Sequence, residues 1–421
     1  MNDELKDTRY SSLITHHFLP THHSLLLMAR HYYLTRSGRL RRKDNTLSFI
    51  PSAEDEAPSE IIESAEAELE SLATGSIPDL EMGDLSFDPD GYTNDEITPT
   101  EIATINLDEE NDAPIKVSER RTIPIEDVDA LWVFRELDLN SRVLNFLAQK
   151  KVPAHFFNYY GFYSGSFYPR EFLQAGYLTV RQVRHYSNKR LRLKIAREFI
   201  AAAMHNILRN MRYYATRGIE LNDETEIVQA ELLRLDSVKD IPQLMGCEGR
   251  ARAAYYKGFG KILRDRFEFA KRVKRPPDNM VNAMISFTNG LVYSACLSQL
   301  YRSQLDPTIS FLHEPGVRRF SLALDVAEIF KPLLADRLIF KLLNNRMLSE
   351  RDFAQDLNFC YLKESGRKII LKEWEARLQT TIEHRRLKRK VSYERLIRLE
   401  CYKLVKHLTN DEPYQGFKAW W

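Results

Sequence analysis

Short apolar runs separated by turn residues occupy the first part of the chain and predict a sheet. In the segment 39–49, Asp44 and Asn45 stand between two strand-like runs, a pattern typical of a β-hairpin. Asn140 is suited to cap a helix, because its side chain can accept a hydrogen bond from a free backbone N–H group. That helix would bury one face, formed by Val143, Leu144 and Leu147. Further strands are predicted at 121–125, 130–134 and 154–157.

From about Phe172 onward, strand patterns fade and apolar residues recur at helical spacing. The segment 190–217 predicts an amphipathic helix with arginines on its polar side. Asp278 is expected to cap a second helix, whose start is fixed by Pro276 and Pro277. We therefore expect an α+β protein with a small β-rich N-terminal domain, residues 28–170, followed by a larger all-helical C-terminal domain, residues 171–421.

An acidic segment interrupts the β-rich part. Residues 45–115 contain 20 Asp or Glu and no Lys or Arg. We expect an insert at 51–115 that is mostly disordered, with an amphipathic helix possible at 59–72. A calcium loop around 88–92 is disfavoured, because Ser86 and Ile97 stand at two of its ligand positions. The insert is either a solvated acidic loop or a competitor of DNA for a basic surface.

Removing the 20 acids of this segment leaves 61 basic and 39 acidic residues, a net charge of +22. Such an excess favours a polyanionic partner, because basic side chains that neutralise phosphates release counterions.

The composition excludes several classes of protein. Hydrophobic residues make up 43% of the 421 positions, enough for real cores. The four cysteines, Cys247, Cys296, Cys360 and Cys401, lack the spacing of a zinc ribbon or a disulfide framework. We find no stretch that approaches the ~20 apolar residues of a membrane span, no signal peptide and no phosphate loop of the GxxxxGK[ST] type. A cytoplasmic protein is expected.

Three residues are candidates for chemistry. Glu248 lies between Gly246 and Gly249 at an expected helix start, although an ion pair with Arg252 four residues later would also explain it. His313 is either a ligand or a hydrogen-bonded structural residue of a loop. Asp325 stands in an apolar run, where an unpaired buried carboxylate is costly, so it needs a partner.

The segments 245–252, 275–278, 281–283, 311–316 and 322–332, in this order, resemble the CRISPR-associated integrase family of spacer acquisition. The resemblance runs from about Met28 to the C-terminus and is interrupted by the acidic insert. It implies that Glu248, His313 and Asp325 form one catalytic metal site in the helical domain. A site of oxygen ligands with one imidazole suits Mg²⁺ or Mn²⁺.

The reaction that the resemblance implies is a direct transesterification. It joins the 3′ ends of captured DNA fragments to the edges of a CRISPR repeat without ATP. Asn282 and Glu328 are expected to support the site.

Phosphate contacts are expected at Arg252, Lys274 and Arg275, which lie near the motifs. The segment 383–393 is the densest basic run, and it is either a solvated helix face or a DNA track. Its candidate DNA-binding residues are Arg385, Arg386, Lys388 and Arg389.

The resemblance also implies a homodimer formed through the β-rich domain and a small ferredoxin-like partner protein in a prokaryotic cytoplasm. The loop 158–165 resembles the type I-B subgroup. Because family members typically begin with a strand such as 31–35, residues 1–27 are expected to be an extension, with Met28 an alternative start. The histidine pairs 16–17 and 22–23 of this extension either chelate a metal or belong to a polar leader.

Two other functions stay open at this point. A DNA-binding scaffold could keep the fold and the charge without a working metal site. A hydrolytic nuclease could admit water in place of the 3′-hydroxyl, and its products would be shorter than its substrates.

Overall fold

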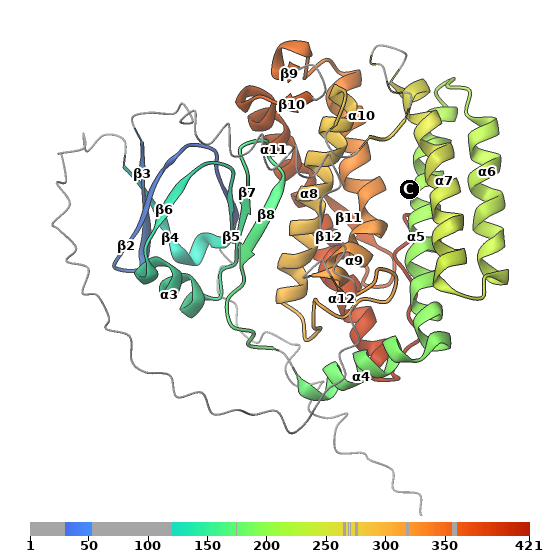
Figure 1. Cartoon of the computed structure of the whole chain (residues 1–421), viewed down its shortest axis with the longest axis horizontal. Coiled ribbons are helices and arrows are strands. Elements are labelled where there is room, and N and C mark those ends of the chain that lie inside the picture. The colour runs from blue at the N-terminus through green and yellow to red at the C-terminus, as the bar shows by residue number, and fades with distance from the viewer. Residues whose placement is uncertain are drawn as a thin grey trace, which may run out of the picture.

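The computed structural model describes residues 30–52, 120–173, 175–263, 267, 269, 271–273, 277–316, 320–355 and 360–421. The predicted N-terminal extension, its histidine pairs and nearly all of the acidic insert lie outside these residues. Within them, strands gather in the first part of the chain and helices dominate the rest, as Figure 1 shows. The mixed α+β prediction is confirmed at this level.

Two four-stranded sheets form the N-terminal domain. One has the order β1-β5-β7-β8, and the other has the order β4-β3-β2-β6. The bounds of these strands are β1 Arg30–Leu34, β2 Gly38–Lys43, β3 Thr46–Pro51, β4 Arg121–Pro124, β5 Val128–Val133, β6 Leu137–Leu139, β7 Ala154–Phe157 and β8 Tyr163–Phe167. The predicted hairpin is confirmed, because β2 and β3 pair antiparallel around Asp44, whose φ is 52°.

Between the sheets lies a small core that includes Leu40, Leu47 and Leu131. Helix α3, Ser141–Lys150, covers it with Val143, Phe146 and Leu147. Asn140 caps this helix as predicted, since its side chain accepts a hydrogen bond from the backbone N–H of Val143.

The helical domain begins after β8. Its helices surround a large core and bring segments far apart in the sequence side by side. Their bounds are α4 Gly176–Ser187, α5 Lys189–Ala215, α6 Asn222–Arg234, α7 Ile241–Ile262, α8 Met280–Tyr301, α9 Ser321–Lys331, α10 Arg337–Asn344, α11 Glu364–Gln379 and α12 Tyr393–Leu408. A π-helical turn, η4 Pro332–Asp336, joins α9 to α10. Short 3₁₀ turns are η2 Ile125–Asp127, η3 Leu235–Ser237 and η5 Glu350–Asp352.

The expectation of an all-helical C-terminal half was wrong. Strands β9 Phe353–Gln355 and β10 Cys360–Leu362 pair antiparallel, and so do β11 Thr381–His384 and β12 Arg389–Ser392. The basic run 383–393 therefore lies on a β-hairpin instead of a helix, with Lys388 at its turn in a left-handed conformation (φ 49°). A run of charged residues has no regular spacing of apolar positions, so its sequence cannot distinguish a hairpin from a helix.

Two helix starts also differ from the prediction. Asn279, and not Asp278, caps α8 by accepting a hydrogen bond from the N–H of Asn282. Helix α7 starts at Ile241 after the cap Asp240, which places Glu248 in the middle of the helix instead of at its start. Asp278 and Asn279 are equally suited to cap a helix. The direction in which the chain enters the helix decides which of them does so.

Helix α8 is the central element of the helical core. By length and composition, it alone among the described helices could cross a membrane, which corrects the expectation that no stretch approaches that length. However, 72% of its most apolar window is buried inside the protein. The absence of charge on α8 is therefore explained by contacts on all sides in a protein core.

Aromatic side chains join the two domains. Phe134, at the end of β5, stacks on Phe157 with 4.3 Å between ring centroids and lies 5.7 Å from Phe287 of α8. Trp132 of β5 is fully buried in the same cluster. The backbone at Gly161 lies close to the Phe287 ring of α8, where a Cβ atom would come within 2.7 Å of the ring. Gly161 also has a φ of 83°, a conformation that favours glycine. The outer face of the first sheet thus belongs to the core of the helical domain.

Candidate active site

The buried carboxylate of Asp325, on α9, binds the loop that follows α8. Asp325 Oδ2 accepts hydrogen bonds from the backbone N–H groups of Phe311 (2.7 Å) and Leu312 (2.9 Å). Its Oδ1 accepts from the backbone N–H of His313 (3.0 Å) and lies 2.7 Å from the Nδ1 atom of the same residue. The Asp325 side chain is completely buried. The partner that the sequence demanded for this carboxylate is therefore the loop itself.

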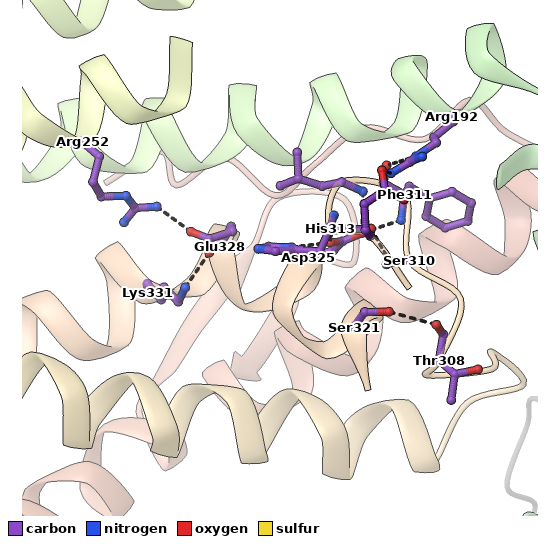
Figure 2. Close-up of polar contacts among 12 residues, drawn as sticks. Arg192, Arg252, Thr308, Ser310, Phe311, His313, Ser321, Asp325, Glu328 and Lys331 are labelled. Atoms are coloured by element: carbon purple, nitrogen blue, oxygen red, sulfur yellow. Dashed lines mark hydrogen bonds and ion pairs between the residues drawn. The ribbon is translucent and has the colours of Figure 1, made fainter. Parts of the chain in front are cut away.

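These contacts fix the imidazole of His313. In the neutral tautomer whose Nδ1–H donates to Asp325, the lone pair of the His313 ring lies on Nε2. Two further bonds hold the loop, from Ser310 Oγ to the carbonyl of His313 (2.6 Å) and from Arg192 Nε to the carbonyl of Phe311 (2.8 Å). Figure 2 shows these bonds converging on the start of α9. A histidine held in this way is typical of a metal ligand whose other nitrogen is oriented by a carboxylate.

Beside this loop, two glutamates share one arginine. Arg252 of α7 donates from Nε to Glu248 (2.8 Å) and from a terminal nitrogen to Glu328 of α9 (2.5 Å). Lys331 donates to the other oxygen of Glu328 at 2.5 Å. The pairing of Glu248 with Arg252 that local sequence offered as an alternative is thus present. Arg252 extends it to a second helix through its bond to Glu328, which Figure 2 shows.

Glu328 belongs to this cluster, and it lies on the same helix as Asp325. Burial alone would raise the pKa of Glu328, but the charges of Lys331 and Arg252 outweigh burial and hold this pKa well below its usual range. The carboxylate of Glu328 is therefore ionised at neutral pH and surrounded by cationic groups. Within the described residues, neither the ligand atoms of Glu248, His313 and Asp325 nor those of Glu248, His313 and Glu328 all lie within 4.8 Å of one another.

Comparison with known proteins shows the family of this chain. Residues 101–376 match the family model described as "CRISPR associated protein Cas1". The chain belongs to the Cas1 family. The CRISPR-associated endonuclease Cas1 3 of Thermodesulfovibrio yellowstonii is 50% identical over 303 residues, which are 72% of this chain and 92% of that protein. The Cas1 endonuclease of Fusobacterium nucleatum is 48% identical over 72% of this chain and 90% of that protein.

Solved structures show the same family. A Cas1 protein from Thermotoga maritima superposes with a TM-score of 0.69 at 32% identity, over 92% of this chain and 99% of that chain. A casposase bound to an integration product superposes with a TM-score of 0.70 at 18% identity, over 93% of each chain, which shows the shared fold. The resemblance to the integrase family is confirmed, whereas the type I-B subgroup stays a prediction.

The supporting role of Asn282 in this Cas1 protein stays a prediction, and its observed hydrogen bonds go to neighbouring residues. Its Nδ2 donates to the carbonyl of Lys271 (3.0 Å) and to Asp278 (2.7 Å), while its Oδ1 accepts from Arg272 (2.9 Å) and from the N–H of Val273 (3.2 Å). All of its hydrogen-bonding capacity is used to hold the segment 271–273 against α8. Any influence of Asn282 on the site would therefore act through the residues that it holds, such as Arg272.

The predicted DNA-binding residues fall into three groups. Arg252 is engaged with two carboxylates, and only 15% of its side chain is exposed. Lys274 and Arg275 lie outside the described residues. The basic residues of the β11–β12 hairpin are exposed, but they differ in their partners. Arg385 lies 5.2 Å from the ring centre of Trp420, and Arg386 forms two hydrogen bonds with Glu412, whereas Lys388 and Arg389 lie at and after the turn.

Sequence reasoning missed Lys331 and Asp336. Lys331 follows Glu328 by three residues, a spacing that could have indicated their ion pair. Asp336 ends the π-helical turn, and burial raises its pKa to about 7 although Arg252 nearby acts in the opposite direction. Local sequence carries no signal for that burial, which arises only when α9, α10 and the rest of the core close around the turn.

Proposed function

We propose that this protein is a divalent-metal-dependent DNA integrase of CRISPR adaptation. It joins the 3′-hydroxyl ends of captured DNA to the edges of a CRISPR repeat by transesterification of a phosphodiester. Membership of the Cas1 family supports this proposal, as do the endonuclease names of relatives near 50% identity. The casposase of the same fold, which is bound to an integration product, supports strand joining over hydrolysis.

The observation that carries the proposal is the fixed imidazole of His313 beside the carboxylates that meet at Arg252. Among the described residues, the hydrogen bond of the His313 ring is made by Nδ1, and the two glutamates have already gathered around a cationic group. The lone pair of Nε2 is therefore left for a metal. An imidazole nitrogen with two carboxylates is a donor set that fits Mg²⁺ or Mn²⁺, with the nitrogen favouring Mn²⁺.

We assign the metal to Glu248, His313 and Glu328, in place of the predicted set with Asp325. A carboxylate has about four lone-pair sites, and Asp325 already accepts four hydrogen bonds. Its position suits a residue that orients His313 and keeps the proton on Nδ1. Glu328 lies three residues further along α9 and meets Arg252 together with Glu248.

The metal, when bound, would polarise the scissile phosphate and stabilise the leaving oxygen. Asp325 would keep the Nε2 lone pair of His313 available as a ligand. Arg252 and Lys331 would place positive charge beside the incoming phosphates once the carboxylates bind the metal. The chain would therefore supply ligands and electrostatic stabilisation, and no covalent protein nucleophile is required.

DNA and protein partners belong to the same proposal. We infer a homodimer formed through the N-terminal sheets and a small ferredoxin-like protein that bridges two dimers. A chain of similar fold at 15% identity comes from a structure titled "Cas6-RT-Cas1--Cas2 complex". That likeness shows the fold, and the family makes assembly with such a partner the expected arrangement.

The test is strand joining of a short DNA duplex into a plasmid that carries a repeat, in Mg²⁺ or Mn²⁺. Glu248→Gln and Glu328→Gln should abolish joining and also the binding of Mn²⁺, measured by calorimetry. Asp325→Asn should weaken Mn²⁺ binding by about 10–100-fold, because it disturbs only the orientation of a ligand. Glu314→Gln is a matched control in the same loop, since Glu314 pairs with Arg192 on the surface and not with the site.

Each other result has a distinct meaning. Undiminished joining by Glu248→Gln would leave a DNA-binding scaffold as the function. Products that are only shorter than the substrate would indicate a hydrolytic nuclease. Complete loss of Mn²⁺ binding in Asp325→Asn, together with normal binding in Glu328→Gln, would restore Asp325 as the ligand.

A further inference from the structure

A second cluster of ligating side chains lies at the junction of the two domains. His31 comes from β1 and Asp129 from β5, while Glu394 comes from the first turn of α12. In the described part of the chain, this is the one group of three potential ligand atoms that lie within 4.8 Å of one another. It shares no residue with the site around His313. Its three members come from both domains, so whatever binds them also ties the domains together.

The distances in this cluster suit a bridging ion better than direct hydrogen bonds. His31 Nε2 lies 3.5 Å from Asp129 Oδ2 and 3.7 Å from Glu394 Oε1. A hydrogen bond between such groups would be about 2.7–2.9 Å long. Two ligands of a tetrahedral ion, each at about 2.1 Å from it, are separated by about 3.4 Å. The three atoms are therefore spaced as ligands of one small cation.

Among the described residues, two of these atoms are buried and form no hydrogen bond, although they lie at ion-pair distance from each other. The third, Glu394 Oε1, accepts a hydrogen bond from Gln299 at 2.8 Å. Within the described part of the chain, His31 Nε2 and Asp129 Oδ2 have no hydrogen-bond partner, and the His31 side chain is only 1% exposed. Leaving two buried polar atoms unsatisfied next to each other is costly, and native proteins rarely do so. A cation between them would satisfy both at once.

Surrounding residues hold the three ligands in place. His31 Nδ1 lies 3.3 Å from Glu375 Oε2, which also accepts a hydrogen bond from the hydroxyl of Tyr33 at 2.7 Å. Asp129 Oδ1 is bound by Arg302 at 2.6 Å, which leaves Oδ2 for the cluster. A carboxylate on Nδ1 of the histidine, with Nε2 directed at the other ligands, is the usual outer layer of a metal site.

The charge of the cluster also calls for a cation. Asp129, Glu375 and Glu394 are three carboxylates around one imidazole, with Arg302 as the paired base. Arg398 is a second cationic group near Asp129. Two guanidinium groups therefore face three carboxylates, and a cation at His31 would balance the remaining negative charge.

We propose that His31, Asp129 and Glu394 form a second divalent-cation site, suited to Zn²⁺, that fastens the N-terminal sheet to α12. Zn²⁺ accepts mixed imidazole and carboxylate ligands at tetrahedral spacing, whereas Mg²⁺ prefers octahedral oxygen ligands and keeps several waters. The site has a structural role, since its ligands are buried between the domains and away from the cluster at Arg252.

The experiment measures zinc in the full chain carrying Glu248→Gln and Glu328→Gln, which lacks both carboxylates proposed for the first site. After treatment with a chelator, the protein is supplied with Zn²⁺ alone and passed through a desalting column. Its zinc content is then measured by mass spectrometry. We expect about one zinc ion per chain, and almost none when His31→Gln or Asp129→Asn is added.

His155→Gln is the matched control, because His155 is also buried beside Trp132 but is bound to Ser166 and Ser298 at 2.7 Å each. It should retain its zinc. Cobalt provides a second readout, since Co²⁺ in a tetrahedral site gives visible absorption bands that Zn²⁺ displaces. The proposal is overturned if the starting protein retains no zinc and shows no cobalt bands, or if His31→Gln retains as much zinc as His155→Gln. Neither readout depends on strand joining, so this result and that of the proposed function are separate.

Discussion

At the scale of single residues, this protein places polar groups in its core only with defined partners or a defined charge. Asp325 is surrounded by backbone N–H groups, and His155 lies between two serine hydroxyls. The two histidines of the N-terminal sheet have opposite titration behaviour, because His31 is surrounded by carboxylates while His155 has neutral neighbours. Burial therefore decides the charge of a side chain only together with its neighbours.

A stability prediction follows for His155. Burial, with a smaller contribution from the charge of His31, lowers the pKa of His155 to about 3 from 6.5. Between these values the unfolded chain binds a proton that the folded protein does not, so stability is fully present above pH 6.5 and falls as the pH decreases. The loss is up to about 1.4 kcal/mol for each pH unit.

His155→Gln removes this titration. In urea unfolding, the variant should be less stable than the natural protein at neutral pH, and the difference should shrink steadily toward pH 5. Parallel stability curves for the two proteins across this range would contradict the assignment of a neutral, buried imidazole.

At the scale of elements, helix α9 carries residues of the proposed metal site, and the β11–β12 hairpin carries the residues expected to contact DNA. Helix α9 supplies both Asp325 and Glu328, which lie on one face of the helix because they are three positions apart. Asp325 contacts the loop at His313, and Glu328 contacts Arg252 of α7. The β11–β12 hairpin concentrates basic residues at an exposed turn next to the C-terminus. We expect this hairpin, and not a basic helix, to contact the DNA backbone.

The hairpin can be tested by salt dependence. Changing Arg385, Lys388 and Arg389 to Gln should weaken DNA binding uniformly across sequences. The slope of log affinity against log salt should decrease by about 0.9 for each phosphate that the variant no longer neutralises. The measurement is a titration of labelled duplex at several salt concentrations.

Arg386→Gln is the internal control for this prediction. Its guanidinium already pairs with both oxygens of Glu412, so its removal should change the slope less than the removal of Lys388 or Arg389. An unchanged slope in the triple variant would remove the hairpin from the DNA interface.

At the scale of the whole molecule, one continuous core joins the domains while the charge is distributed unevenly along the chain. Trp132, Phe134 and Phe157 of the first sheet belong to the same core as α8. A dimer formed through the N-terminal sheets would therefore hold the active sites in fixed positions relative to each other. The acidic segment 45–115 opposes a body that carries +22 without its 20 acids.

Deletion of residues 54–112, which contain these acids, tests whether the insert shields the basic body. The shortened protein should bind DNA more tightly at low salt and with a steeper salt dependence, because long-range repulsion of the phosphates is removed. Fluorescence anisotropy with one duplex, measured across a salt titration, is sufficient. Equal affinities of both forms at every salt concentration would discard the shielding role.

Local structure can be predicted from neighbouring residues wherever a residue type leaves few choices. The turn at Asp44, the Asn140 cap and the mixed order of strands and helices all depend on neighbouring residues, and all were predicted. The sequence also showed that Asp325 requires a partner, because an ionised carboxylate in an apolar run has no other solution. The family resemblance then predicted a metal site of Glu248, His313 and Asp325, with Glu328 in support.

Which of these side chains come into contact depends on how the helices and loops pack together. Glu248 and His313 are 65 positions apart, and no local period relates them. The loop folds onto α9 so that Asp325 accepts hydrogen bonds from its backbone N–H groups. Arg252 bonds to both Glu248 and Glu328 and so links the two glutamates. The junction of His31, Asp129 and Glu394 is likewise invisible in the sequence, because it exists only where the sheet packs on α12. Contacts between distant segments depend on how whole elements pack, which local patterns do not specify.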